Sequence, residues 1–208
     1  MRNYFTVIGF CVLMASINAA YAHEHTMDMD MNMDMHEAHQ HHHAETVVSN
    51  RTVLVNVPEV SLIRQDGTKV EINKVLADDK LAVLSFIYTS CQNICPLTSQ
   101  TLSQLQKKIP ESIGRVHLVS ISIDPENDTP RKLTNYAAKY HAAKNWDHFT
   151  GTIQASIAVQ KAFDVFQGDK MNHAPVYFVK TVADGHWERV DGLVSADVLL
   201  NTLERGSK

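Results

Sequence analysis

Two cysteines follow a continuous apolar run in the stretch LAVLSFIYTSCQNICP, residues 81–96. An apolar run without polar alternation is typical of a strand that is buried on both faces of a sheet. A stripe of apolar residues at helical spacing follows the second cysteine and stops before Pro110. Its members are Leu97, Leu102, Leu105 and Ile109. The stretch therefore predicts a central strand, a cysteine-bearing turn and a helix.

Strands and helices alternate along the rest of the chain. We expect strands at 51–60, 116–123, 176–179 and 187–190, helices at 129–142, 152–163 and 195–204, and turns at 66–67 and 184–185. This order predicts an α/β sandwich with a central mixed sheet that is flanked by helices. It is compatible with a thioredoxin-like fold.

Length and charge narrow the classes of function. The chain has 208 residues, a length that favours a single folded domain, and its formal net charge is −4. These numbers indicate no basic surface, so binding to nucleic acid is not expected. Residues 23–45 hold six acidic residues and no Lys or Arg, which leaves a nearly neutral body at 46–208.

Residues 1–22 have the pattern of a cleaved secretory signal peptide. Arg2 precedes an apolar run, and the triplet at 20–22 is Ala-Tyr-Ala, a small-x-small cleavage site. The apolar run is shorter than the roughly 20 residues of a spanning helix, so no stable membrane span is expected after cleavage. We therefore expect an exported, periplasmic protein that retains two cysteines, Cys91 and Cys95.

Residues 23–45 form a tail that is poor in branched and aromatic side chains. Such a segment buries too little apolar surface to fold alone, so we expect it to be disordered. Thioether and imidazole groups suit copper, and thioethers select Cu(I). A passive leader would not explain the methionines. The predicted copper-capturing residues are His23, His25, Met27, Met29, Met31, Met33, Met35, His36, His39, His41, His42 and His43.

The cysteine pair is suited to metal binding or to redox chemistry. Pro96 disfavours helical geometry at the residue before it, so Cys95 is expected to cap the helix. A thiol at the positive end of a helix has a lowered pKa and is a better nucleophile and ligand. Cys91 and Cys95 are therefore candidate metal ligands and, if the pair is redox active, catalytic residues. A structural disulfide is a weaker interpretation, because so small a ring stabilises little.

His173 lies in the sequence MNHAP, directly before the strand predicted at 176–179. In a thioredoxin-like sandwich this loop abuts the cysteine turn, so His173 could add a nitrogen ligand to the two sulfurs. Two thiolates and an imidazole suit both Cu(I) and Cu(II), and zinc is also compatible with them. The neighbouring Met171 is either a transient soft ligand or a residue that packs the loop.

Three motifs occur in an order that resembles the Sco/SenC family of copper metallochaperones. They are TSCQNICP at 89–96, VSISIDPENDTP at 119–130, and the late histidine before a strand. The resemblance spans roughly residues 53–203 and implies a thioredoxin-like fold with copper bound by Cys91, Cys95 and His173. It also implies delivery of copper to, or thiol reduction of, a respiratory oxidase copper site. Another periplasmic copper protein would be the alternative recipient.

Two acidic residues of the second motif are placed near the copper by this resemblance. Asp124 either forms a hydrogen bond to one of the metal ligands or forms a turn. Asp128 or Thr129 can cap the next helix. Two residues depart from the family pattern. Asn172 replaces the acidic residue that usually precedes the histidine, and Pro175 stands where thioredoxin-like redox enzymes carry a cis-proline. The proline raises the prospect of dithiol exchange.

Other functions are alternatives to copper delivery. A thiol-disulfide oxidoreductase would use the cysteines to reduce a partner before metallation. A peroxiredoxin-type peroxidase is disfavoured, because Tyr88 and Gln92 stand where that class places Thr. Copper buffering by the tail alone would leave the three motifs unexplained. Four further histidines are assigned structural roles, and they are His117, His141, His148 and His186.

Overall fold

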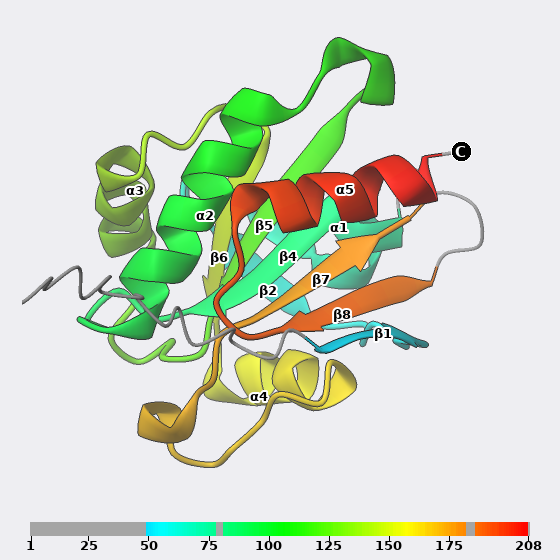
Figure 1. Ribbon diagram of the computed structural model, residues 1–208. Helices are drawn as coiled ribbons and strands as arrows, with labels where there is room; N and C mark the ends of the chain where they lie inside the picture. Colours follow the sequence, from blue (N-terminus) through cyan, green and yellow to red (C-terminus); the bar gives the residue numbers. More distant parts are fainter. Residues whose placement is uncertain (1–48, 78–80, 182–185, 208) are drawn as a thin grey trace, which may run out of the picture. The chain divides into compact units, whose positions relative to one another are not determined.

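The computed structural model describes residues 49–77, 81–181 and 186–207. Its strands form one eight-stranded mixed sheet in the order β1-β8-β7-β4-β5-β6-β2-β3 (Figure 1). The strands are β1 (Ser49–Val53), β2 (Ser61–Arg64), β3 (Lys69–Glu71), β4 (Leu81–Ile87), β5 (Val116–Ser122), β6 (Trp146–Gly151), β7 (Val176–Lys180) and β8 (Trp187–Asp191). The helices are α1 (Ile72–Ala77), α2 (Ile94–Lys108), α3 (Pro130–Lys139), α4 (Ile153–Ala162), α5 (Ala196–Gly206) and the short 3₁₀ helices η1 (Glu111–Ile113) and η2 (Lys170–Asn172).

Strand β4 is buried along its whole length because helices cover both faces of the sheet. Val83 and Ile87 point into the core that α2, α3 and α5 cover. Leu84 and Phe86 alternate with them and point into the opposite core, which α1 and α4 cover (Figure 1). The uninterrupted apolar run is therefore explained by helices on both sides, as the sequence predicted.

The pairing of the central strands brings three chain segments together at one end of these strands. β4 and β5 are parallel, and β5 and β6 are parallel, whereas β7 is antiparallel to β4. The carboxyl ends of β4 and β5 and the start of β7 therefore lie at the same edge. In open α/β sheets, functional sites collect at the carboxyl ends of the strands. This edge carries the cysteine turn, the segment after β5 and the loop before β7.

The strand predicted at 51–60 is wrong over most of its length. β1 ends at Val53 and pairs at the sheet edge with β8, and residues 54–60 lie outside any strand. Pro58 has no N–H to donate to a ladder, which is one reason the strand does not continue. The short strands β2, β3 and β6 were not predicted. The turn predicted at 184–185 lies outside the described residues, as do the signal peptide and the tail.

Threonines begin two of the helices. The side chain of Thr129 accepts a hydrogen bond from the backbone of Lys132 at the start of α3. Thr152 caps α4 in the same way. Helix α2 begins at Ile94, so the prediction that Cys95 precedes the helix is wrong. Pro96 is accommodated because backbone N–H groups in the first turn have no partner within the helix.

Candidate functional site

The turn between β4 and α2 holds both cysteines as free thiols. Cys91 is partly exposed, whereas Cys95 lies in the first turn of α2 and is 1% exposed. The backbone N–H of Cys95 donates to Cys91 Sγ over 3.5 Å. The Cys91 sulfur therefore lies against the N-terminal turn of α2. The free backbone N–H groups of this turn stabilise a negative charge on the sulfur.

The two thiols differ in how readily they ionise. Burial opposes ionisation of Cys91, but N–H groups of Cys95 and Asn93 and the Tyr88 hydroxyl bond to its thiolate and lower its pKa to about 7. Burial raises the pKa of Cys95 to about 12. Sequence reasoning assigned the lowered pKa to Cys95, and that assignment is wrong. The backbone N–H groups at the start of α2 stabilise the thiolate of Cys91, which accepts hydrogen bonds from them. Cys95 is buried within the first turn of the helix, and burial opposes its ionisation.

Asp128 holds the start of the cysteine turn by hydrogen bonds to Thr89. Its carboxylate is fully buried and accepts hydrogen bonds from the backbone N–H and the hydroxyl of Thr89. It also accepts a 2.6 Å hydrogen bond from the Ser122 hydroxyl at the end of β5. The helix-capping role considered for Asp128 belongs to Thr129. Asp128 instead ties the segment after β5 to the residue that enters the cysteine turn.

Tyr88 links the cysteine turn to the loop before β7. The side chain is 7% exposed, and its hydroxyl donates to Met171 Sδ over 3.6 Å. Burial raises the pKa of Tyr88 to about 12, so the hydroxyl stays protonated and is a hydrogen-bond donor at neutral pH. The ammonium of Lys170 lies 5.6 Å from the centre of the tyrosine ring. Neither Tyr88 nor Lys170 was singled out as a site residue from the sequence.

Asp124 holds the same loop by an ion pair. Its carboxylate is 6% exposed and accepts from Lys170 Nζ over 2.6 Å, and the side-chain amide of Asn127 donates to its other oxygen. The bond to Asp124 raises the pKa of Lys170. Asp124 therefore connects the end of β5 to η2, which immediately precedes His173. This contact supports the loop that carries the predicted third ligand.

His173 follows η2 and is 7% exposed. Its Nε2 lies 3.2 Å from the carbonyl oxygen of Phe86, and burial lowers the pKa of the imidazole. The ring is therefore neutral at pH 7, the form that binds metals. Within residues 49–77, 81–181 and 186–207, no three His, Cys, Asp or Glu side chains are gathered closely enough to hold a metal ion. The structure brings Cys91 and Cys95 together and turns the imidazole toward β4.

The loop before β7 has trans geometry at its proline. None of the described peptide bonds is cis, so Ala174–Pro175 is trans. The sequence left the geometry of this bond open, and the trans geometry removes the support that a cis-proline at Pro175 would have given to dithiol exchange. Gly192, the residue after β8, donates its backbone N–H to the carbonyl of Pro175 over 2.9 Å. The loop is fixed by this backbone bond.

A cavity of about 420 Å³ opens beside the loop. Asp124, Lys170 and His173 line it together with residues of α4, including Gln160. Neither Cys91 nor Cys95 is among the residues that line it. We assign it no ligand.

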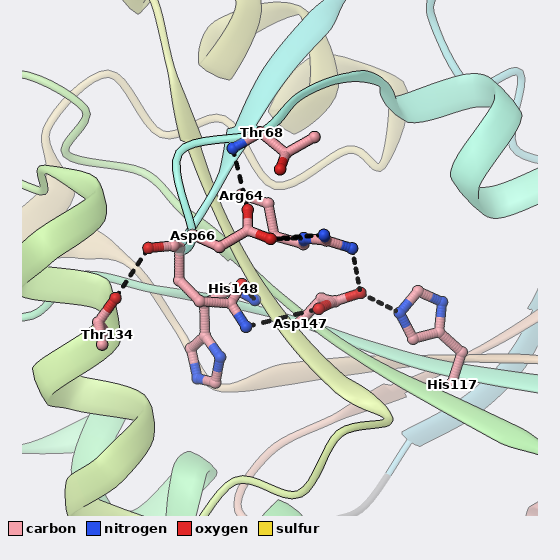
Figure 2. A network of polar contacts seen from close by, with 8 residues as sticks. Arg64, Asp66, Thr68, His117, Thr134, Asp147 and His148 are labelled. Carbon is pink, nitrogen blue, oxygen red and sulfur yellow. Dashed lines mark hydrogen bonds and ion pairs between the residues drawn. The ribbon is translucent and has the colours of Figure 1, made fainter.

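The histidines that were assigned structural roles lie apart from the cysteine turn. Figure 2 shows a network around Asp147, in which His117 Nε2 lies 3.0 Å from Asp147 Oδ2. Arg64 approaches the same carboxylate at 4.0 Å. His148 is fully buried with its ring stacked on Trp146, at 5.1 Å between centroids. These contacts join β2, β5 and β6.

Comparison with known proteins identifies the family. The model of the SCO1/SenC family matches residues 54–186. The chain belongs to the SCO1/SenC family. A SCO1 protein homologue of Bacillus subtilis (strain 168) is 39% identical over 94 residues, which are 45% of this chain and 48% of that protein. The mitochondrial SCO1 homologue 1 of Arabidopsis thaliana is 38% identical over 82 residues, 39% of this chain and 24% of that protein. The chain thus matches half or less of these relatives' lengths.

Solved structures of SCO1/SenC proteins share the fold. Arabidopsis thaliana ScoI with copper bound superposes with a TM-score of 0.63 at 26% identity, covering 72% of this chain and 96% of that one. BsSco, described as a member of the Sco family of cytochrome c oxidase assembly proteins, gives 0.62 at 28% identity, covering 76% and 96%. A SCO1/SenC family lipoprotein from Bacillus anthracis gives 0.65 at 22% identity, covering 76% and 98%. The predicted thioredoxin-like sandwich is confirmed.

The described part of the chain contains no helix that is both long and apolar enough to cross a membrane. The signal peptide predicted at 1–22 and the copper-capturing tail predicted at 23–45 lie outside the described residues.

Proposed function

We propose that this protein is a periplasmic copper chaperone that binds Cu(I) and Cu(II) through Cys91, Cys95 and His173. It would deliver the ion to the copper site of a respiratory oxidase subunit or to another periplasmic copper protein. The observation that carries the proposal is the cysteine turn itself. It presents a partly exposed thiol with a pKa of about 7 beside a second free thiol, in a chain of the SCO1/SenC family.

The donor set fits copper as cargo. Thiolates favour Cu(I), and an imidazole helps to hold Cu(II). His173 is neutral at pH 7. It lies just before β7, whose first residues are at the same end of the sheet as the cysteine turn. Its Nε2 contacts the Phe86 carbonyl, so the ring would bind with the two sulfurs either through Nδ1 or after turning away from that carbonyl. Asp128 and Asp124 would support the site by holding the turn and the loop in place.

A competitive titration with Cu(I) tests the proposal. The reduced chain beginning at Thr46 retains both hydrophobic cores, so it is expected to fold, and it lacks the tail ligands. We expect one tightly bound Cu(I) per chain, measured against a chromogenic chelator. Because His173→Ala removes one of three ligands, affinity should fall by at least about tenfold, or 1.4 kcal/mol.

His141→Asn is the matched control. His141 is exposed and has a φ of 55°, a conformation that asparagine tolerates. The control should bind Cu(I) like the parent chain. Binding that is weak, or equally strong in the His173 and His141 variants, would contradict the three-ligand site.

Thiol-disulfide exchange is the second candidate function. The low pKa and exposure of Cys91 favour it as the attacking thiolate, which would form a mixed disulfide with a partner and release one partner thiolate. Cys95 would then lose its proton and attack Cys91, giving the reduced partner and a Cys91–Cys95 disulfide. A dithiol reductant must restore the pair after each cycle. Copper-free protein that reduces no candidate partner would count against this function.

A further inference from the structure

Met171 is the single methionine of the body at 46–208, since the other seven precede residue 46. It is not used to fill a core. The side chain is 69% exposed, although the described body buries most of its large apolar residues. An exposed thioether at the edge that carries the cysteines calls for an explanation other than packing.

The Tyr88 hydroxyl is close to both the Met171 sulfur and the Cys91 sulfur. The Tyr88 hydroxyl donates to Met171 Sδ over 3.6 Å, and it is also close enough to Cys91 to help lower the pKa of that thiol. Tyr88 is nearly buried, so its hydroxyl is held in one place between the two loops. The two sulfurs therefore lie within reach of the same small volume. A metal ion in that volume would take the place of the hydroxyl as their common partner.

The backbone of Met171 is fixed independently of its side chain. Its N–H donates to Asp169 Oδ1 over 2.9 Å. The adjacent Lys170 is held by Asp124 and lies over the ring of Tyr88. The thioether is thus presented from an anchored turn. Ordering it on a ligand would cost only side-chain freedom.

The two candidate ligands of the loop differ in exposure. The imidazole of His173 is buried against the carbonyl of Phe86, whereas the thioether of Met171 is exposed and reaches the cysteine turn through Tyr88. In this conformation the donor that the loop offers beside Cys91 is sulfur. Two thiolates and a thioether form a soft set that favours Cu(I) over Cu(II).

We propose that Met171 is a ligand in a Cu(I) loading site that it forms with Cys91 and Cys95, the site that the ion meets while His173 is turned inward. This inference rests on the proposed function, in that it requires the two cysteines to bind copper. It adds a residue and an oxidation-state preference that the cysteine and histidine set alone does not contain.

The methyl resonance of Met171 provides a direct readout. The full chain is labelled with ¹³C at its methionine methyl groups, and the Met171 signal is assigned with Met171→Leu, which conserves volume. One equivalent of Cu(I) is supplied from a chelator complex that leaves weak sites empty. We expect the Met171 signal to shift while the tail signals stay in place. In the His173→Ala background, where the imidazole cannot compete for the ion, we also expect Met171→Leu to lower Cu(I) affinity about tenfold. Leu54→Ala, at an exposed position outside the site, should leave the affinity unchanged.

Two failures of this experiment have different meanings. Cu(I) binding that requires Cys91 and Cys95, with an unmoved Met171 signal and no effect of Met171→Leu in the His173→Ala background, would overturn the loading site and leave the proposed function intact. Failure of the unmodified chain to take Cu(I) from the chelator would overturn both. A Met171 shift that persists in His173→Ala supports a site that forms before the histidine binds.

Discussion

Cys91 and Cys95 lie within one turn of each other, yet their thiols differ because only one of them faces hydrogen-bond donors. Cys91 accepts from backbone N–H groups at the start of α2 and from Tyr88, whereas Cys95 is buried in the core below it. A nucleophile or ligand that is ionised near pH 7 therefore stands beside one that keeps its proton. Copper binding or disulfide formation must remove that proton.

Alkylation of the reduced protein should separate the two thiols. Because the thiolate is the reactive form, modification of Cys91 by iodoacetamide should rise with pH with a midpoint near 7. Cys95 should stay unmodified up to pH 9, because its pKa is about 12 and its side chain is buried. Peptide mass spectrometry between pH 5 and 9 measures both rates.

Two tyrosine variants serve as a matched pair for this measurement. Tyr88→Phe removes one donor to the thiolate and should raise the Cys91 midpoint by about one unit, the effect of a hydrogen bond to a charged group. Tyr140→Phe removes a buried hydroxyl that has no partner among the described residues and should leave the midpoint unchanged. Equal reactivity of the two cysteines would contradict the assignment.

The sequence predicted some of the site residues and could not predict others. The spacing of the cysteines and the proline after them marks Cys91 and Cys95 directly. The ion pair of Lys170 with Asp124 joins residues that are 46 positions apart, and no local pattern encodes it. The direction of the His173 ring depends on a carbonyl of β4, 87 positions earlier. Such contacts follow from the pairing of β4 with β7.

Strand β6 contains an imidazole in an apolar environment. His148 is fully buried, and neither ring nitrogen has a hydrogen-bond partner within the described residues. Burial lowers its pKa to about 4. The sequence WDHFTG of β6 has two polar residues in its first half and no simple alternation, which explains why the strand was not predicted, whereas the unbroken apolar run of β4 was.

The burial of His148 should make the protein less stable in acid. Its pKa is lower in the folded chain than in the unfolded chain, where it is 6.5, so unfolding takes up a proton below that pH. Stability should therefore fall as pH decreases from 6.5 toward 4, and this residue should contribute a loss of about 3 kcal/mol.

Replacement of the imidazole tests this contribution. His148→Leu, which has a similar volume and no charge, should reduce the loss of unfolding free energy between pH 7 and pH 4, as measured with urea. His141→Asn removes an exposed imidazole instead and should leave the pH dependence unchanged. A pH profile that is the same in all three proteins would exclude burial of His148 as a cause.

Across the whole molecule, the sequence divides into a Met- and His-rich tail at 23–45 and a body at 46–208. The tail accounts for five of the eight methionines and seven of the twelve histidines. The donors in the body are few by comparison, and the proposed site uses two cysteines, one histidine and one methionine. We therefore expect the two parts to bind copper in different numbers and with different strength.

Deletion of residues 23–45 should lower the number of Cu(I) ions bound per chain without changing the affinity of the cysteine site. Stoichiometry is measured by elemental analysis after equilibration with excess Cu(I), and affinity by chelator competition. A chain in which the five tail methionines are replaced by leucine distinguishes the thioethers from the histidines. Unchanged stoichiometry after the deletion would contradict copper capture by the tail.

The edge strand β1 fixes where the body begins relative to the site. Ser49 pairs with Asp191, and Asp191 pairs with Val176, so Ser49 lies two strand spacings, about 10 Å, from the start of β7. The six Cα–Cα steps from residue 43 to residue 49 span at most about 20 Å. If His43 binds copper, as predicted for the tail, the length of the intervening chain would keep the ion within about 30 Å of the start of β7. Its effective concentration there would be on the order of millimolar, so transfer along the chain would not depend on how dilute the protein is.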